Sequence, residues 1–284
     1  MSFWTDTEDW HTAGEPFRIV QTLPEGYLPT APTVKDSRLI VINTPNHPLD
    51  QLRQSLCHEP RGHSDQYGGF ITLPDNNDAH FGVLFWHKDG FSTACGHGTI
   101  ALGYWAVTKK LVQVPENGNV DVVIDVPSGR VVAKMAVERG RPVHGDFINV
   151  KSYQIAKGLS VTVPSRNFDV KVNLAFAGAV YAHVDVTQLG LMVEPSRHID
   201  FINSGTASRI AVLLAEGRLG IGKGKLLHRS IIDTLFEADI VSEEASPVKF
   251  PACIPRVRGT ANLVGQMSFF IDPADPVYPG FLLR

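Results

Sequence analysis

Two short segments of this chain are apolar on nearly every side, and they constrain the fold more than any other feature. The first runs from Thr99 to Lys110, has helical spacing, and ends in a pair of lysines. The second runs from Ile210 to Ala215 and is followed by Gly217, a residue suited to the left-handed turn that closes a helix. A helix that is apolar all round must be surrounded by other elements. Each segment is therefore predicted to be a buried central helix.

Runs with the residue types of β-strands fill the chain around both helices. Glycine, proline and Asn/Asp turns separate these runs. They cover residues 17–20, 38–41, 69–72, 82–87, 120–126 and 130–137 in the first half, and 147–150, 159–163, 170–174 and 180–184 in the second. The pattern predicts a mixed, mostly antiparallel fold in two halves, each with strands leading to one buried helix.

The entries to the two helices are similar in sequence. Cys95-Gly96-His97-Gly98-Thr99 precedes the first and Ile202-Asn203-Ser204-Gly205-Thr206 the second, so both contain a Gly-Thr step. Because this step is common before helices, it favours an internal repeat only weakly.

Charge and composition exclude several classes of protein. The formal net charge is −3 and basic residues form no stripe, which argues against nucleic-acid binding. A window of about 18 apolar residues, as a membrane helix needs, is absent from the sequence. The first residues are acidic where a signal peptide would be basic, and the cysteines, Cys57, Cys95 and Cys253, have no metal-ligand spacing. We expect a cytoplasmic protein without a metal.

The sequence around Cys95 carries the strongest chemical signal. Gly96 and Gly98 expose backbone N–H groups at a helix start, where an anion such as a carboxylate can bind. The same partial positive charge lowers the pKa of a thiol, so Cys95 is predicted to be a thiolate that acts as nucleophile or general base. The alternative is a small core residue beside glycines that only make the turn.

Other clusters of polar residues have weaker interpretations. Residues 9–16 and 59–63 group ionisable side chains around a glycine, as in loops ordered by polar contacts or in solvated turns. Residues 220–225 are glycine-rich but lack the spacing of a phosphate-binding loop, so we predict a plain turn. Cys57 and Cys253 lack a glycine-helix context, which favours structural roles.

Five motifs in this order resemble the proline racemase family over nearly the whole chain. That family contains proline racemases, hydroxyproline epimerases and trans-3-hydroxy-L-proline dehydratases. The motifs are Asp9-x-His11-Thr12-x-Gly14-Glu15-Pro16, Glu59-Pro60-Arg61-Gly62-His63, Cys95-Gly96-His97-Gly98-Thr99, His228-Arg229-Ser230-Ile231-Ile232 and Asp272-Pro273-x-Asp275-Pro276-x-x-x-Gly280-Phe281.

The resemblance implies an α+β, diaminopimelate-epimerase-like fold. Two similar domains, here 1–148 and 149–284, would each wrap a curved, mainly antiparallel sheet around a central helix, and the last residues may return to the first domain. The active site would lie between the domains and need no cofactor. Family members are often dimers, so a homodimer is an open expectation.

The second half departs from the family pattern. Racemases of the family have a second cysteine at the second helix, and dehydratases usually have threonine there; this chain offers Ile202, or Ser204 in a gapped alignment. The family also has several tens of residues, including a strand, where this chain has only Met192 to His198. The second domain is therefore predicted to be shortened. Smaller departures are alanine or aspartate at usual glycine positions, namely Ala13, Ala177 and Asp233.

The resemblance and the single thiol together predict a hydro-lyase that dehydrates trans-3-hydroxy-L-proline. Cys95 would remove the α-proton, and His97 is a candidate proton donor to the hydroxyl. Asp200 would receive the ring nitrogen of this small imino acid. Backbone groups near Gly96, His97, Gly98, Gly205 and Thr206 would hold its carboxylate. The alternatives are a proline racemase or 4-hydroxyproline epimerase, a catalytically impaired family member, and, last, a thiol hydrolase.

Overall fold

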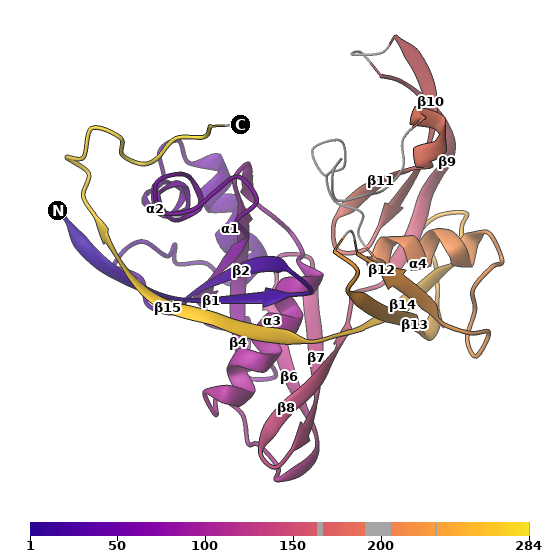
Figure 1. Ribbon diagram of the computed structural model, residues 1–284, viewed down its shortest axis with the longest axis horizontal. Coiled ribbons are helices and arrows are strands. Elements are labelled where there is room, and N and C mark those ends of the chain that lie inside the picture. The colour runs from indigo at the N-terminus through magenta and orange to yellow at the C-terminus, as the bar shows by residue number, and fades with distance from the viewer. Residues whose placement is uncertain (164–166, 191–205, 231, 284) are drawn as a thin grey trace. The chain divides into compact units, whose positions relative to one another are not determined.

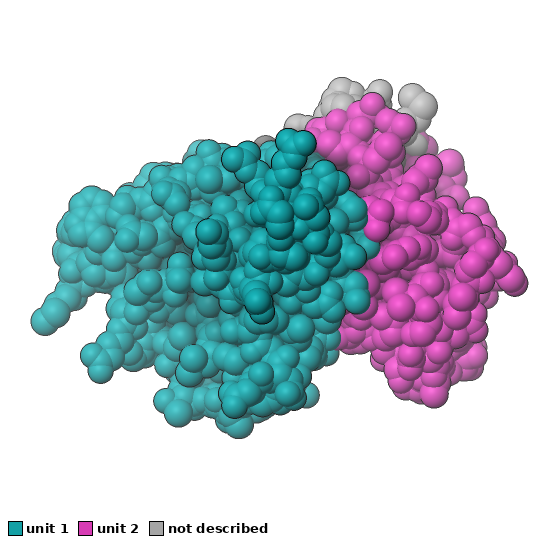
Figure 2. All heavy atoms as spheres, turned by 90° about the horizontal axis from the view of Figure 1, so that it is seen from below, with its two compact units in different colours: residues 1–146, 259–284 teal, residues 147–258 magenta. Residues whose placement is uncertain are grey.

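The computed structural model describes residues 1–163, 167–190, 206–230 and 232–283. It divides into two compact units, drawn in teal and magenta in Figure 2. Unit 1 comprises Met1–Asp146 and Gly259–Arg284, and unit 2 comprises Phe147–Arg258. The chain thus leaves unit 1 once and returns to it with its last strand (Figure 1). None of the helices in the described ranges is long and apolar enough to cross a membrane.

The sheet of unit 1 has the strand order β8-β7-β6-β4-β3-β2-β1-β15, with β5 beside β4. Pairs β2–β3 and β4–β6 are parallel, whereas β1–β15, β1–β2, β3–β4 and β6–β7 are antiparallel. The strands are β1 (Phe3–Thr12), β2 (Glu15–Val20), β3 (Gly68–Thr72), β4 (Phe81–His87), β5 (Gly90–Phe91), β6 (Asn117–Val126), β7 (Gly129–Glu138), β8 (Arg141–Ile148) and β15 (Ala261–Ile271).

Helix α3 (Gly96–Thr108) is the central helix of unit 1 and is buried continuously from Gly98 to Val107. It contacts β1, β2, β7 and β15. Close packing requires a glycine at Gly103, because a Cβ there would approach Met135 Sδ to 2.5 Å. The helix ends with Lys110 at φ 55° and a bond of 2.9 Å from Leu111 N–H to the Ala106 carbonyl. These are the features of a Schellman motif.

Two further helices, α1 (Val34–Asn43) and α2 (Pro48–Cys57), pack with the sheet in a second apolar cluster. Side chains of β2 alternate between its two faces, so Val20 joins this cluster while Phe17 lies against α3. The predicted strand at 38–41 is wrong, because it lies within α1. Thr33 caps this helix, accepting a bond from Asp36 N–H, and this cap outweighs the strand preference of the β-branched run that follows.

Unit 2 has the strand order β11-β10-β9-β14-β13-β12 around helix α4 (Thr206–Ala215). Ile210, Ala211 and Val212 of α4 are fully buried, and the helix contacts β9, β10 and β13. The elements are β9 (Ser152–Val163), β10 (Phe168–Phe176), β11 (Val180–Val184), η1 (Val186–Leu189), β12 (Leu226–Arg229), β13 (Leu235–Glu244) and β14 (Ala252–Gly259).

Helix α4 ends as α3 does. Gly217 has φ 68°, and Arg218 N–H donates to the Leu213 carbonyl at 2.9 Å. The two predicted apolar helices therefore correspond to α3 and α4, and the predicted role of Gly217 is confirmed. The glycine-rich segment 220–225 forms turns before β12, as expected.

Candidate active site

Cys95 is the residue that begins helix α3. Its backbone is extended, with φ −153° and ψ 106°, and its carbonyl accepts from Thr99 N–H at 3.0 Å and Thr99 Oγ1 at 2.8 Å. Gly98 permits the crowding around this turn, because a Cβ there would lie 2.4 Å from the Phe17 ring and 2.9 Å from Cys95 Sγ. The glycine thus lets strand β2 and the thiol both approach the first turn of the helix.

Burial dominates the acidity of the Cys95 thiol. The residue is only 5% exposed, and desolvation raises its thiol pKa well above the usual value. The Gly98 N–H acts in the opposite direction, and the nearby Glu15 carboxylate raises the pKa further. Burial therefore outweighs the lowering of this pKa that the helix terminus was predicted to produce, since one backbone donor does not offset the loss of water. The surroundings of the sulfur favour the thiol over the thiolate.

His97 lies beside the thiol but is not aligned to exchange a proton with it. Cys95 Sγ is 3.6 Å from both ring nitrogens. A sulfur equally far from both lies along neither outward N–H direction, so it forms no straight hydrogen bond. The ring bonds to the Pro16 carbonyl, and burial lowers the pKa of His97 to about 4. His97 is therefore neutral at pH 7, which argues against its expected role as proton donor.

Aromatic rings hold His97 in this position. The centroid of the imidazole lies 5.1 Å from that of Tyr67 and 6.1 Å from that of Phe17, and both contacts are edge-to-face. This geometry is favourable for aromatic pairs. The ring is thus a fixed wall beside the thiol.

The turn between β1 and β2 is fastened to the same loop. Thr12 Oγ1 donates to the His97 carbonyl at 2.9 Å, and the His97 ring bonds to the Pro16 carbonyl. The turn itself has Ala13 at φ 55° and Gly14 at φ 91°, the left-handed pair typical of a two-residue hairpin. The motif at 9–16 is therefore an ordered part of the site's surroundings.

The motif at 59–63 attaches the C-terminal segment to the rest of unit 1. Glu59 and Phe281 exchange two backbone hydrogen bonds of 3.0 Å. Arg61 Nε donates to the Phe270 carbonyl at 3.1 Å, and its guanidinium lies 3.4 Å from Asp275. These contacts show that the closing motif at 272–281 is a structural partner of the motif at 59–63.

Arg18 connects the motif at 9–16 with residues 56–61. Sequence analysis predicted no role for it. It forms a two-bond ion pair with Asp9, at 2.8 and 2.7 Å, and also donates to the carbonyls of Leu56 and Arg61. A buried arginine bonded this fully is a structural residue. The only sequence signal was the acidic partner Asp9 in the first motif.

Several predicted site residues lie outside the described residues. These are Asp200, Gly205 and the two candidates for the second motif, Ile202 and Ser204. Thr206 is the first residue of α4. Gly96, His97 and Gly98 all lie in the first turn of α3, next to Cys95.

The other two cysteines have structural surroundings. Cys57 Sγ donates to the Gln66 carbonyl at 3.2 Å, and Cys253 is fully buried in β14. Burial raises the pKa of both thiols to about 12. Within the ranges the structure describes, no group of His, Cys, Asp and Glu is placed to hold a metal.

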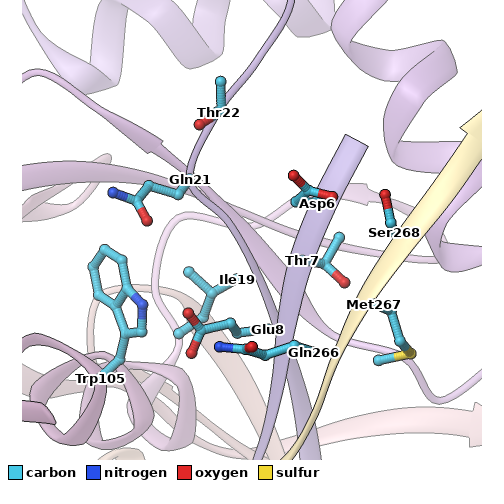
Figure 3. A pocket seen from close by; sticks show the side chains of 10 residues that line it. All are labelled: Asp6, Thr7, Glu8, Ile19, Gln21, Thr22, Trp105, Gln266, Met267 and Ser268. Atoms are coloured by element: carbon cyan, nitrogen blue, oxygen red, sulfur yellow. The ribbon is translucent and has the colours of Figure 1, made fainter. Parts of the chain in front are cut away.

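A hollow of about 440 Å³ lies elsewhere in unit 1, on the face of the sheet near the end of α3 (Figure 3). Its lining comprises Asp6, Thr7, Glu8, Ile19, Gln21, Thr22, Trp105, Gln266, Met267 and Ser268. None of these belongs to the Cys95 loop or to the hairpin tip. The hollow is thus separate from the candidate site around Cys95.

A comparison with protein-family models now decides the family. The model described as proline racemase matches residues 8–205 and 201–282. The chain belongs to the proline racemase family. Curated relatives include the trans-3-hydroxy-L-proline dehydratase of Azospirillum brasilense, 32% identical over 98% of both chains. The human enzyme of that name is 30% identical over 97% of this chain and 94% of its own, and proline racemase of Clostridioides difficile is 29% identical over 97% of both.

Solved structures of family members share the fold. A hydroxyproline epimerase from Agrobacterium vitis superposes with a TM-score of 0.87 at 20% identity, over 99% of this chain and 96% of its own. A probable proline racemase from Agrobacterium radiobacter K84 gives 0.86. The predicted α+β, diaminopimelate-epimerase-like fold is confirmed.

The curated relatives are longer than this chain. The alignment with the Azospirillum brasilense enzyme runs over 343 positions, more than the 284 residues of this chain. The family model matches in two pieces that overlap at residues 201–205. The relatives therefore carry residues that have no counterpart here.

Proposed function

We propose that this protein is a hydro-lyase that dehydrates trans-3-hydroxy-L-proline to a pyrroline-2-carboxylate. The observation that carries the proposal is a single thiol at the start of a central helix, Cys95, with no cysteine in the matching segment 202–206. Removal of water needs one base at the α-carbon, whereas inversion needs a second proton carrier on the opposite face. Curated dehydratases at 30–32% identity over nearly the full chain support this choice.

The proposed reaction begins with transfer of the α-proton to Cys95. The electron pair of the broken C–H bond forms the C2–C3 double bond, and the 3-hydroxyl leaves with a proton as water. The enamine that results tautomerises to a cyclic imine. N–H groups of the first turn of α3, at Gly96, His97 and Gly98, are suited to hold the carboxylate and the charge that develops beside it. Asp200, Gly205 and Thr206 would complete the site from the second half.

The raised pKa of Cys95 requires that substrate binding help to ionise the thiol. The substrate carries a positively charged ring nitrogen next to the α-carbon. A cation within a few ångströms favours a thiolate, most strongly where water is excluded. In this proposal the unliganded site keeps a protonated, unreactive sulfur, and the base forms only when the imino acid arrives.

Racemisation of proline is the second candidate, favoured by relatives such as the proline racemase of Clostridioides difficile. It needs a second proton carrier. Cys57 lies in α2 and Cys253 in β14, both are buried, and neither belongs to the segments 95–99 and 202–206 that precede the central helices, so we assign neither thiol this role. We therefore rank dehydration first.

The remaining expectations belong to the same proposal. We propose a cytoplasmic enzyme, because all three cysteines are unpaired. We propose two domains, 1–148 and 149–284, with the last residues returning to the first domain, which the division into units supports. We also propose a small imino acid as its ligand and a homodimer as its assembly. No cofactor enters the proposed steps.

The experiment is incubation of the purified chain with trans-3-hydroxy-L-proline and detection of the cyclic imine with aminobenzaldehyde. We expect imine from the parent protein and from Cys253→Ala, and none from Cys95→Ala. Accumulation of the mirror-image amino acid without imine would favour the racemase. A folded protein without turnover of any of these substrates would favour the impaired family member.

A further inference from the structure

Loss of water needs an acid as well as a base, and the described part of the site offers a better acid than His97. A hydroxyl is a poor leaving group unless it receives a proton as the C–O bond breaks. His97 is neutral, with its pKa lowered to about 4 and its ring bonded to the Pro16 carbonyl. The N–H proton of the neutral His97 ring is therefore already donated to the Pro16 carbonyl.

Strand register places the side chain of Glu15 on the side of β2 that faces the start of α3. Glu15 and Phe17 are two residues apart on β2 and share a face. Phe17 packs against Gly98 and the His97 ring. Glu15 also pairs directly with Thr12 of β1, whose hydroxyl donates to the His97 carbonyl. Phe17 and Thr12 both point to the Cys95 loop. The side chain of Glu15 shares their face of the sheet and therefore points to the same side.

The hairpin tip is held firmly enough to fix this carboxyl group. The bonds from Thr12 and to Pro16 attach both arms of the turn to His97. Glu15 pairs with Thr12 in the ladder and precedes Pro16 in the chain, so it is next to both anchored residues. Because the residue as a whole remains exposed, a ligand can reach it.

The charges around Glu15 favour its protonated form. Partial burial of the carboxyl raises the pKa of Glu15, and Asp65, in the loop after the 59–63 motif, raises it further. The Cys95 thiol interacts with Glu15 from the start of α3, and His11 Nδ1 accepts from Gly14 N–H in the same hairpin. As a carboxylate, Glu15 would oppose the formation of the Cys95 thiolate. As a carboxylic acid it would not, and it would carry a proton to give.

We infer that Glu15 is the general acid that protonates the departing 3-hydroxyl, an inference that rests on the proposed dehydration. Cys95 takes the α-proton and becomes a thiol, while Glu15 gives its proton to the hydroxyl oxygen and becomes a carboxylate. The C3–O bond breaks, its electrons leave with water, and the C2–C3 double bond forms. A proton then passes from the thiol through solvent to Glu15, which restores both groups.

The test separates proton removal from water loss in one variant. In Glu15→Gln, exchange of the α-proton of trans-3-hydroxy-L-proline with D2O, followed by NMR, should stay within a few-fold of the parent. Formation of the imine should fall about 10²–10³-fold, the usual effect of removing an acid. The matched control is Glu25→Gln, the same change on an exposed turn, which should leave both rates unchanged.

A substrate analogue with chloride in place of the 3-hydroxyl gives a second readout. Chloride leaves without a proton, so Glu15→Gln should eliminate it at a rate close to that of the parent. A variant that is merely misfolded would lose this elimination as well. If Glu15 protonates the leaving group, Glu15→Gln should lose elimination only with the 3-hydroxyl substrate.

Asp65→Asn removes the charge that, after burial, raises the pKa of Glu15. Without this neighbour the pKa of Glu15 should fall. The active form needs a protonated Glu15 beside an ionised Cys95, and the pKa of Glu15 is the lower of the two, so it sets the acidic limb of the pH–rate profile, which should move to lower pH. The height of the plateau should also fall, tenfold for each unit by which the pKa of Glu15 falls, because a smaller fraction of the enzyme then has this pair of protonation states. An unchanged profile would contradict the inference.

Two outcomes distinguish this inference from the proposed function. Imine formation by Glu15→Gln at the parent rate would overturn the role of Glu15 and leave the dehydratase standing. Failure of the parent protein to lose water from any 3-hydroxyproline would overturn both.

Discussion

At the scale of single residues, opposing effects on one group decide the chemistry of this site. The start of α3 lowers the pKa of Cys95 through the Gly98 N–H, while burial raises it more. Sequence reasoning finds the first effect, because Gly96 and Gly98 are visible in the motif. It left the second only as an alternative, because Phe17 and the hairpin that lie beside the first turn of α3 come from elsewhere in the chain.

The buried imidazoles make stability depend on pH. Burial lowers the pKa of both His97 and His183 to about 4. A depressed pKa means that the folded state binds the proton more weakly than the unfolded chain, whose histidines titrate near 6.5. The free energy of unfolding should therefore be constant above about pH 7 and fall as the pH is lowered towards 4.

Urea denaturation at pH 7, 5.5 and 4.5 measures this effect. His97→Gln should reduce the difference in unfolding free energy between pH 7 and 4.5 relative to the parent. An equal pH dependence in the two proteins would show that His97 is not the group responsible.

Backbone strain at the hairpin tip gives a second prediction at this scale. Ala13 has φ 55°, a conformation that costs an alanine roughly 1 kcal/mol and a glycine almost nothing. Ala13→Gly should raise the free energy of unfolding by about 1 kcal/mol. Ala177→Gly is the matched control, because Ala177 is buried and has an ordinary φ, and it should lower stability by about 0.5–1 kcal/mol. Destabilisation by both changes would contradict this account.

At the scale of elements, the central helices were predictable because their composition leaves no alternative. An apolar helix can only be surrounded, so the predicted helices at 99–110 and 210–215 correspond to α3 and α4, although α3 begins at Gly96 and ends at Thr108. Helix α1 was not, because Leu39, Ile40, Val41 and Ile42 have strand preferences that the cap at Thr33 overrides. The pairing of Glu59 with Phe281 was equally invisible, because it joins segments far apart in sequence.

The ends of the two helices give a matched pair of substitutions. Lys110 and Gly217 occupy the same left-handed position of the same closing motif, at φ 55° and 68°. Lys110→Gly should therefore stabilise the protein by about 1 kcal/mol, and Gly217→Ala should destabilise it by about the same amount. Thermal unfolding of both variants measures the shifts. Shifts of the same sign would contradict the equivalence of the two helix ends.

At the scale of the whole molecule, the chain has the Cys95 motif but no cysteine or threonine at Ile202 or Ser204, the candidates for the second position. The returning C-terminal segment is attached to the rest of unit 1 by the Arg61–Asp275 ion pair and by Arg18, whose guanidinium lies over the Phe269 ring. The alignment of 343 positions against 284 residues shows that the relatives are longer. The proton-transfer groups that we identify, Cys95 and Glu15, both belong to unit 1. The proton transfer that we propose therefore uses side chains of unit 1.

The most direct measurement follows the configuration of recovered substrate in D2O. The purified protein would be incubated with trans-3-hydroxy-L-proline and with L-proline, and both enantiomers or epimers at Cα would be separated and assayed for deuterium. With Cys95 as the base and no cysteine in the segment 202–206, we predict imine from the hydroxylated substrate and deuterium only in molecules that keep the original configuration. Deuterium in the inverted isomer would contradict the account.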